Sequence, residues 1–306
     1  MRSSSASRDS TGAASVVGRE LTVPAEDGRA LAATLYEPAS PPAPGAPITI
    51  VAAGAAIQRR FYGRFAAYLA ERGSPALTFD YRDIGGSRLG SLGGSRVRMR
   101  DWCLLDVPGV LDWARRTCPE RPIHWVGHSM GGFATGLAHN NHLIARQLNV
   151  ATLSGYWGRM AAPERYRIFL LMGYVAPLVV GALGYIPGRL MGGEDMPGPA
   201  FMEWRGWCMT PGFLFADATL PETRNFPGLR APLRVARIAD DPWGTEAAVA
   251  HMTAHYTGSV DRSVWRIAPS DAGVKKIGHF GFFRSEMRET LWRVAVDWLM
   301  APGARS

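Results

Sequence analysis

The sequence contains very little lysine, and its positive charge is not clustered. Lys275 and Lys276 are the only lysines among the 34 basic residues, and the arginines that give the chain a formal net charge of +8 are scattered. Nucleic-acid binding would require a basic stripe or a recognisable motif, and because the sequence has neither we expect no nucleic-acid partner. Scattered charge is more typical of a solvated surface than of a site for anionic membranes or acidic substrates.

Cysteines and targeting signals are also scarce. Cys103, Cys118 and Cys208 are odd in number and form no Cys-x-x-Cys pair, which excludes a disulfide framework and agrees with a reducing compartment. Residues 1–19 are rich in serine and arginine but lack the apolar core of a secretory signal, so we interpret them as a disordered tail. We therefore predict a cytoplasmic protein.

Metal-binding patterns are missing as well. His251 and His255 are four residues apart in an expected helix, but the residues between them lack the glutamate of a zinc-protease helix. We interpret the two histidines as a surface pair and predict neither a metal nor an organic cofactor.

A single long segment of the sequence is free of charge. Ile168 to Pro187 runs for 20 residues between Arg167 and Arg189, and by length alone it could span a bilayer. Glycines and Pro177 interrupt the segment, and arginines flank both of its ends, which leaves the topology signal ambiguous. We expect two short apolar helices that break near Pro177, with insertion into a membrane as the alternative.

What the sequence does contain is an alternation of apolar strands and helices. A chain of this length with 47% hydrophobic residues can bury a substantial core. Asp27-Gly28 marks a hairpin between two antiparallel strands, and helical segments such as 59–72 and 101–117 separate later strands. The eight expected strands are residues 20–23, 31–36, 48–53, 75–79, 123–126, 148–153, 233–238 and 263–268. This pattern predicts an α/β fold with a mostly parallel eight-stranded sheet and helices on both faces.

Residues 155–230 interrupt this alternation and are rich in aromatic side chains. We interpret them as an inserted helical cap, so that residues 20–154 and 231–301 form the core domain. The core ends in a helix over about residues 285–300. Its spacing places Leu291, Val294, Ala295, Trp298 and Leu299 on one face.

A candidate nucleophile follows the strand 123–126. Gly127-His128-Ser129-Met130-Gly131 places a serine between two glycines where a strand runs into an expected helix. Such a sharp turn exposes the serine hydroxyl, and the glycines let neighbouring backbone approach closely. A neutral serine also needs a base, and His279, in a glycine-flanked loop, is the only histidine after the last predicted strand.

Two carboxylates follow the strand 233–238. Asp240 and Asp241 both lie after the serine and before the histidine, where an acid that orients the histidine is expected. We favour Asp241, since Asp-Pro begins a turn and the orienting group belongs at the apex of the loop. Asp240 is the alternative, because spacing does not fix the register of a loop.

An acyl-transfer reaction also requires backbone N–H groups that are fixed in advance to stabilise the oxyanion. The N–H of Met130, directly after the serine, is the first candidate. The second is the N–H of Ala55, in the Gly54-Ala55-Ala56 loop after the third strand.

These motifs resemble those of the α/β-hydrolase superfamily. Asp80 to Ser87 is similar to the Asp-x-Arg-Gly-x-Gly-x-Ser loop of many members, with Asp83 in place of a glycine, and we interpret Arg82 as part of an internal ion pair. Ala53 departs from the His-Gly that is common before the oxyanion loop. Within the superfamily, the chain is similar to predicted hydrolases and to lysophospholipase-like or serine-aminopeptidase-like esterases.

The resemblance implies a serine hydrolase that cleaves a carboxylic ester through an acyl-enzyme on Ser129, His279 and Asp241. The apolar cap predicts a small-molecule substrate with a hydrophobic acyl or alkyl group. We expect the substrate pocket to include Trp157, Trp204, Trp207, Trp243 and Phe280. The alternatives are acyl transfer to another acceptor, cleavage of a thioester or peptide, and ligand binding without catalysis on the same scaffold.

Overall fold

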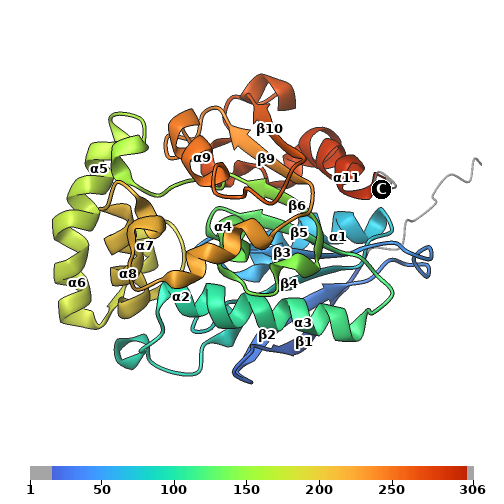
Figure 1. Cartoon of the computed structure of the whole chain (residues 1–306), viewed down its shortest axis with the longest axis horizontal. Coiled ribbons are helices and arrows are strands. Elements are labelled where there is room, and N and C mark those ends of the chain that lie inside the picture. The colour runs from blue at the N-terminus through green and yellow to red at the C-terminus, as the bar shows by residue number, and fades with distance from the viewer. Residues whose placement is uncertain (1–15, 302–306) are drawn as a thin grey trace, which may run out of the picture.

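The computed structural model describes residues 16–301, in which an eight-stranded sheet is covered by helices on both faces (Figure 1). Most of the predicted tail, residues 1–15, lies outside the described residues, and the first strand already begins at Gly18. The strands of the sheet are β1 (Gly18–Pro24), β2 (Ala30–Tyr36), β3 (Ile48–Ala52), β4 (Ala76–Phe79), β5 (Ile123–His128), β6 (Ile144–Val150), β9 (Leu233–Ile238) and β10 (Arg262–Ile267).

The order of the strands explains where a site can form. The order is β1-β2-β4-β3-β5-β6-β9-β10, and only β2 pairs antiparallel with its neighbours. Every residue of β3 and of β5 is buried, as their apolar sequences predict for strands covered on both faces. The chain passes from β3 to β4 on one side and then returns to β5 on the other side of β3. A crevice therefore opens beyond the carboxyl ends of β3 and β5.

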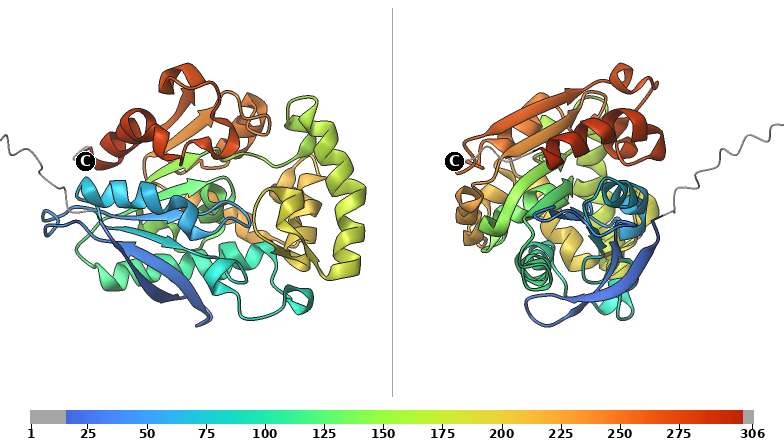
Figure 2. Two further views of the ribbon diagram at one scale, coloured as in Figure 1. Left: turned by 180° about the vertical axis from the view of Figure 1, so that it is seen from behind. Right: turned by 90° about the vertical axis from the view of Figure 1, so that its right-hand side faces the viewer.

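Helices α3 and α4 cover the face of the sheet that is turned toward the viewer in Figure 1, whereas α1 and α11 cover the other face (Figure 2). Pro108 lies directly after a π-helical turn, Trp102–Asp106, that joins α2 to α3, and this wider turn accommodates the missing N–H without breaking the helix. The core helices are α1 (Gly63–Glu71), α2 (Met99–Asp101), α3 (Val107–Thr117), α4 (Met130–Leu137), α9 (Glu246–Thr253), α10 (Gly278–Gly281) and α11 (Arg293–Met300).

Strand β6 and the last helix differ from their predicted forms. The sequence predicted a strand over residues 148–153, whereas β6 spans Ile144–Val150. Its polar residues fit inside the sheet because they have buried partners: Gln147 donates to the Gly132 carbonyl at 3.1 Å. The last helix contains a π-helical turn over Arg288–Trp292, and its extra residue shifts the phase of the helix after this turn. Val294 is therefore 42% exposed, whereas Val296 is buried.

The inserted segment 155–230 lies between β6 and β9 and contains mostly helices. It stands beyond the carboxyl ends of the strands, at the left of Figure 1. Its elements are α5 (Glu164–Leu170), α6 (Ala176–Leu183), β7 (Tyr185–Ile186), α7 (Gly188–Met191), β8 (Met196–Pro197) and α8 (Gly198–Cys208).

The uncharged segment forms one continuous helix and not two broken ones. Glu164–Leu183 is helical over 20 residues, with a π-helical turn at Leu171–Val175 that joins α5 to α6. Pro177 has no N–H to donate, and the wider turn before it absorbs this defect without a break. Arg205 on α8 donates to the carbonyls of Met172 at 2.6 Å and of Gly173 at 3.2 Å, and so pairs oxygens next to the defect.

Candidate active site

Ser129 stands on a strained turn between β5 and α4. Its backbone has φ 51° and ψ −114°, a conformation that a side chain other than glycine's seldom adopts. The turn is held by the Ser129 N–H, which donates to the Val150 carbonyl at 2.9 Å, and by Thr152, which donates to the Ser129 carbonyl at 3.0 Å. Strands β5 and β6 therefore fix the position of the hydroxyl.

The two glycines of the motif are needed because the backbone is crowded. A Cβ on Gly131 would lie 2.6 Å from the carbonyl oxygens of both Ala52 and Ala53, at the end of β3. A Cβ on Gly127 would overlap the backbone of Gly131 and Gly132. The spacing predicted from the sequence thus has a steric origin in this fold.

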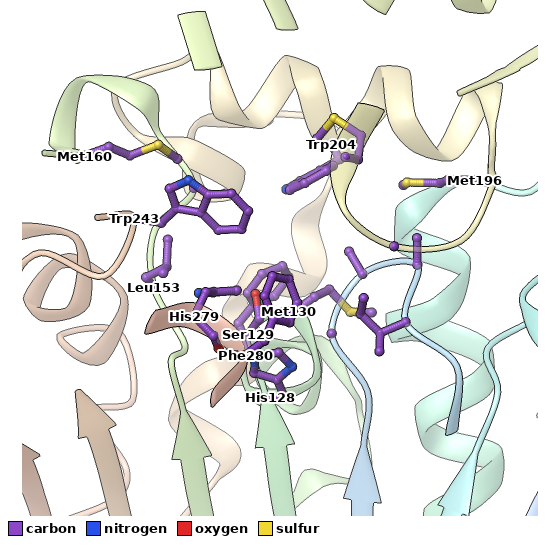
Figure 3. Close-up of a pocket in the computed structure, with 18 of the residues that line it drawn as sticks. His128, Ser129, Met130, Leu153, Met160, Met196, Trp204, Trp243, His279 and Phe280 are labelled. Atoms are coloured by element: carbon purple, nitrogen blue, oxygen red, sulfur yellow. Dashed lines mark hydrogen bonds between the residues drawn. The ribbon is translucent and has the colours of Figure 1, made fainter. Parts of the chain in front are cut away.

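His279 and Asp241 meet at the same edge of the sheet. The Nδ1 atom of His279 donates to Oδ2 of Asp241 at 2.7 Å, and the carboxylate also accepts the Trp243 N–H at 2.9 Å. The Asp241 side chain is fully buried. Since Nδ1 carries the proton, Nε2 of neutral His279 is free to accept one. Figure 3 shows His279 beside Ser129, and both residues line one pocket.

Asp240, the alternative carboxylate, points to a different partner. It accepts the N–H groups of Ile277 at 2.9 Å and of Gly278 at 3.0 Å. It therefore holds the loop that carries His279 through the backbone, whereas Asp241 contacts the imidazole itself.

The backbone N–H groups of Met130 and Ala55 face no acceptor within the described chain. Met130 is the first residue of α4, so its N–H has no intrahelical partner. The loop that carries Ala55 is held on both sides: the Gly54 N–H donates to the Tyr62 hydroxyl at 2.9 Å, and the Glu194 N–H donates to the Ala56 carbonyl at 2.7 Å. Two donors are thus available for an oxyanion.

A buried hydrogen-bond chain joins the three loops of the site. The Tyr62 hydroxyl lies 2.7 Å from Nδ1 of His128, and Nε2 of His128 lies 2.9 Å from the His279 carbonyl. A carbonyl can only accept, so Nε2 carries the proton and Nδ1 accepts from Tyr62. Burial lowers the pKa of His128 to about 3 and raises the pKa of Tyr62 well above its usual value. Both groups therefore stay neutral, and the direction of the chain is fixed.

The pocket between the core and the cap is almost entirely apolar. About 730 Å³ in and above this pocket is free of protein atoms, a volume that includes open solvent. Ser129, Met130, His279 and Ala55 lie on its core side, and cap residues close it from above (Figure 3). The side chains that form its apolar wall are Ile57, Phe133, Leu153, Met160, Met191, Met196, Trp204, Phe213, Trp243 and Phe280.

Three of the five predicted pocket aromatics line this space, namely Trp204, Trp243 and Phe280. Trp157 does not, because it packs on Phe169 with ring centroids 4.6 Å apart. Trp207 does not either, because it is buried and donates to Asp217 at 2.8 Å. The sequence prediction missed the methionines of the wall, since they follow no helical or strand period.

Trp243 connects the cap to the histidine. Its ring lies 4.6 Å from the His279 ring, measured between centroids. Its indole N–H donates to Glu164, the first residue of α5, at 2.7 Å. The cap is also joined to this loop by the Ala161 N–H, which donates to the Pro242 carbonyl at 2.8 Å.

The glycine-rich loop after β4 has a structural role. Asp83 has φ 62°, the left-handed conformation for which related loops use glycine. Arg82 is buried and pairs with Asp106 at 2.6 Å and with Asp27 at 2.9 Å, which is the internal ion pair expected from the sequence.

No cluster of histidine, cysteine, aspartate or glutamate that could hold a metal ion is found among residues 16–301. His255 stacks on Phe215, with ring centroids 3.3 Å apart, and lies next to His251.

Part of the chain matches a known family. Residues 45–179 match the family described as serine aminopeptidase, S33, a segment that includes Ser129 but ends before Asp241 and His279. No curated protein sequence matches the chain.

Solved structures share the arrangement over nearly the whole chain. A hypothetical protein of Pseudomonas aeruginosa is 16% identical with a TM-score of 0.58, over 92% of this chain and 93% of that one. An esterase of Pyrococcus furiosus is 15% identical with a TM-score of 0.57, over 94% and 92%. An α/β serine hydrolase without lid from Xanthomonas campestris is 14% identical with a TM-score of 0.52, over 94% and 97%. These likenesses show a common fold.

Proposed function

We propose that the chain is a serine hydrolase of the α/β-hydrolase superfamily that cleaves carboxylic esters with a hydrophobic acyl or alkyl group, a proposal that the partial family match and the shared fold support. The observation that carries the proposal is the 2.7 Å hydrogen bond between Asp241 and His279, at the edge of a pocket that Ser129 also lines. A serine on a strained turn, a base with a free Nε2 and a buried carboxylate together form the arrangement that nucleophilic acyl transfer requires.

The mechanism follows from this arrangement. Ser129 Oγ attacks the ester carbonyl while Nε2 of His279 accepts the hydroxyl proton, and Asp241 stabilises the resulting imidazolium. The N–H groups of Met130 and Ala55 donate to the oxyanion. When the intermediate collapses, His279 returns the proton to the leaving alcohol and the acyl-enzyme remains on Ser129. Water then attacks the acyl carbonyl by the same route and releases the acid.

The lining of the pocket supports an ester over an aminopeptidase substrate. Among the described residues that line it, none is Asp, Glu, Lys or Arg. A free α-amino group is charged at neutral pH, and burying it without a carboxylate partner costs several kcal/mol. An uncharged apolar acyl or alkyl chain instead gains about 0.8 kcal/mol for each buried methylene.

Labelling with a fluorophosphonate probe tests the nucleophile. The wild-type protein is expected to react and Ser129→Ala is expected not to, because the probe forms a covalent bond only with an activated serine. Ser91→Ala, at an exposed position in the loop after β4, is the matched control and should label like the wild type. Undiminished labelling of Ser129→Ala would disprove the assignment.

The reaction type is tested with two chromogenic substrates. A p-nitrophenyl ester of a medium-chain acid should be hydrolysed, with a burst of p-nitrophenol if the acyl-enzyme accumulates. A p-nitroanilide of an amino acid with a free amino group should not. Faster cleavage of the anilide would favour a peptidase and contradict the proposed substrate class.

A further inference from the structure

The outer face of the cap helix Glu164–Leu183 is apolar and uncovered. Leu170, Tyr174 and Leu178 follow one another at intervals of four residues, and they are 57%, 61% and 76% exposed. Tyr166, Val175 and Leu183 extend the same helix surface at 51%, 47% and 45% exposure. Only 17% of the most apolar stretch of this helix is buried inside the protein. Monomeric proteins seldom expose such a continuous apolar stripe without a partner for it.

The inner face of the same helix is fixed to the cap. Ile168, Met172 and Ala176 are buried, and α6 packs against β7 and α8. Arg205 on α8 donates to two carbonyls of the π-helical turn. Withdrawing the helix into a bilayer would break these bonds and leave the carbonyls unpaired in hydrocarbon. Only the outer side of the helix is therefore available for contact with a partner or a bilayer. The helix lies along the outer edge of the molecule (Figures 1 and 2).

A loop that carries exposed basic side chains contacts one end of the helix. The loop 88–98 contacts the C-terminal end of the helix, where Gly93 packs on the Leu183 carbonyl. Leu89 in this loop is 76% exposed. Arg88, Arg96 and Arg98 are exposed, and none of them pairs with a carboxylate in the described part of the chain.

An exposed tyrosine and an arginine lie at the other end. Tyr166 is exposed, and the Arg165 guanidinium lies over its ring at 4.7 Å. Tyrosine and arginine are side chains that place an apolar body in the acyl region and a polar group at the lipid headgroups. Arginines beside an anionic bilayer each add about 1 kcal/mol of attraction.

We propose that the outer face of helix 164–183, with the loop 88–98, docks on the surface of a bilayer that contains anionic phospholipid. The helix lies in the interface and does not span it, because Arg205 and α8 hold its inner face. A second copy of the chain fits this face less well. Antiparallel pairing of two such faces would set Arg88, Arg96 and Arg98 near the partner copy's N-terminal helix end, where the carboxylate of Glu164 already accepts from Arg167 and Trp243.

Co-sedimentation with vesicles tests the proposal. The protein carries Ser129→Ala throughout, so that the readout is binding and is independent of ester hydrolysis. Vesicles of phosphatidylcholine alone are compared with vesicles that also contain phosphatidylglycerol. The protein is expected to bind the anionic vesicles, and Leu170→Gln with Leu178→Gln should weaken this binding at least about tenfold, since two exposed leucines no longer enter the acyl region.

Two further variants separate the apolar and basic contributions. Arg88→Gln with Arg96→Gln and Arg98→Gln should lower binding to the anionic vesicles toward the level seen with phosphatidylcholine. Val260→Gln, at a position that is 94% exposed but distant from the cap, is the matched control and should bind like the parent.

Two results of the vesicle experiment would overturn the proposal. Failure of the parent to bind anionic vesicles, or equal binding by the leucine variant, would exclude the docking face. Light scattering checks the remaining alternative. A dimer that the leucine substitutions dissociate, together with no vesicle binding, would assign the face to self-association and overturn the proposal as well.

Discussion

His128 donates a hydrogen bond from Nε2 to the backbone carbonyl of His279, across 2.9 Å. The residue directly before the proposed nucleophile thus holds the backbone of the proposed base. The chain continues through Tyr62 to the N–H of Gly54, beside the oxyanion donor Ala55. One run of buried hydrogen bonds therefore connects the nucleophile, the base and the oxyanion loop, although their residues are far apart in sequence.

Removal of the Tyr62 hydroxyl should impair this alignment. In Tyr62→Phe, Gly54 loses its acceptor and His128 loses its donor. We expect these two lost hydrogen bonds to lower kcat by at least about tenfold, with little change in KM. Steady-state kinetics on a p-nitrophenyl ester measures both. Tyr68→Phe is the control, because its hydroxyl accepts only from Arg72 at 3.2 Å. A rise in KM at unchanged kcat would contradict a positioning role for Tyr62.

Acid should destabilise the protein through His128. Its pKa is about 3 in the folded protein, below the ordinary value of 6.5, so the unfolded chain binds more protons between these two limits. The folded state therefore loses stability as pH falls below 6.5, by about 2 kcal/mol at pH 5 from this group alone. Urea unfolding measures the free energy of unfolding at pH 7.5 and at pH 5. The loss of this free energy between the two pH values should be smaller for His128→Gln than for the wild type. His142→Gln, at an exposed position, should lose as much free energy of unfolding between the two pH values as the wild type.

The two neighbouring carboxylates should respond differently to substitution. Asp241→Asn removes the acceptor that holds Nδ1–H of His279, and we expect kcat to fall by about 10⁴-fold because the imidazole adopts the wrong tautomer. Asp240→Asn keeps one of the two oxygens, so that one of the Ile277 and Gly278 N–H groups loses its acceptor while the imidazole keeps its own, and its kcat should stay within about tenfold of the wild type. Equal losses in both variants would argue against Asp241 as the group that orients the base.

The apolar pocket should select for chain length. We expect kcat/KM for p-nitrophenyl esters to rise from acetate toward octanoate by up to about fourfold per methylene, until the pocket is filled. Met196→Glu places a carboxylate on the pocket wall and should abolish this rise, whereas Met202→Glu, at an exposed position on α8, should not. A preference for acetate over octanoate in the wild type would show that the cap leaves no room for a chain.

Local sequence patterns predicted the parts of the fold that depend on local geometry. The elbow at Ser129 was found because the strand, the serine and the two glycines are consecutive, and the mostly parallel sheet was predicted because strands alternate with helices. The phase shift at Val294 and the continuous helix around Pro177 were not found, because a π-helical turn leaves no compositional mark.

The supports of the site were harder to predict because they join residues that are far apart. Tyr62 and His128 are separated by 66 residues, and His128 and the carbonyl of His279 by 151. Nothing in either segment marks the other as its partner. Met160, Met191 and Met196 likewise line the pocket only because short cap segments place them there, without any repeating pattern.

Glu164 begins the helix whose outer face is apolar, and it also accepts the indole N–H of Trp243, whose ring covers His279. The base is thereby shielded by a side chain that is tethered to the cap. Displacement of this end of the helix must break the hydrogen bond between Glu164 and Trp243, and the Ala161–Pro242 hydrogen bond lies next to it. Movement of the cap and access of water to the imidazole of His279 are therefore coupled through Trp243.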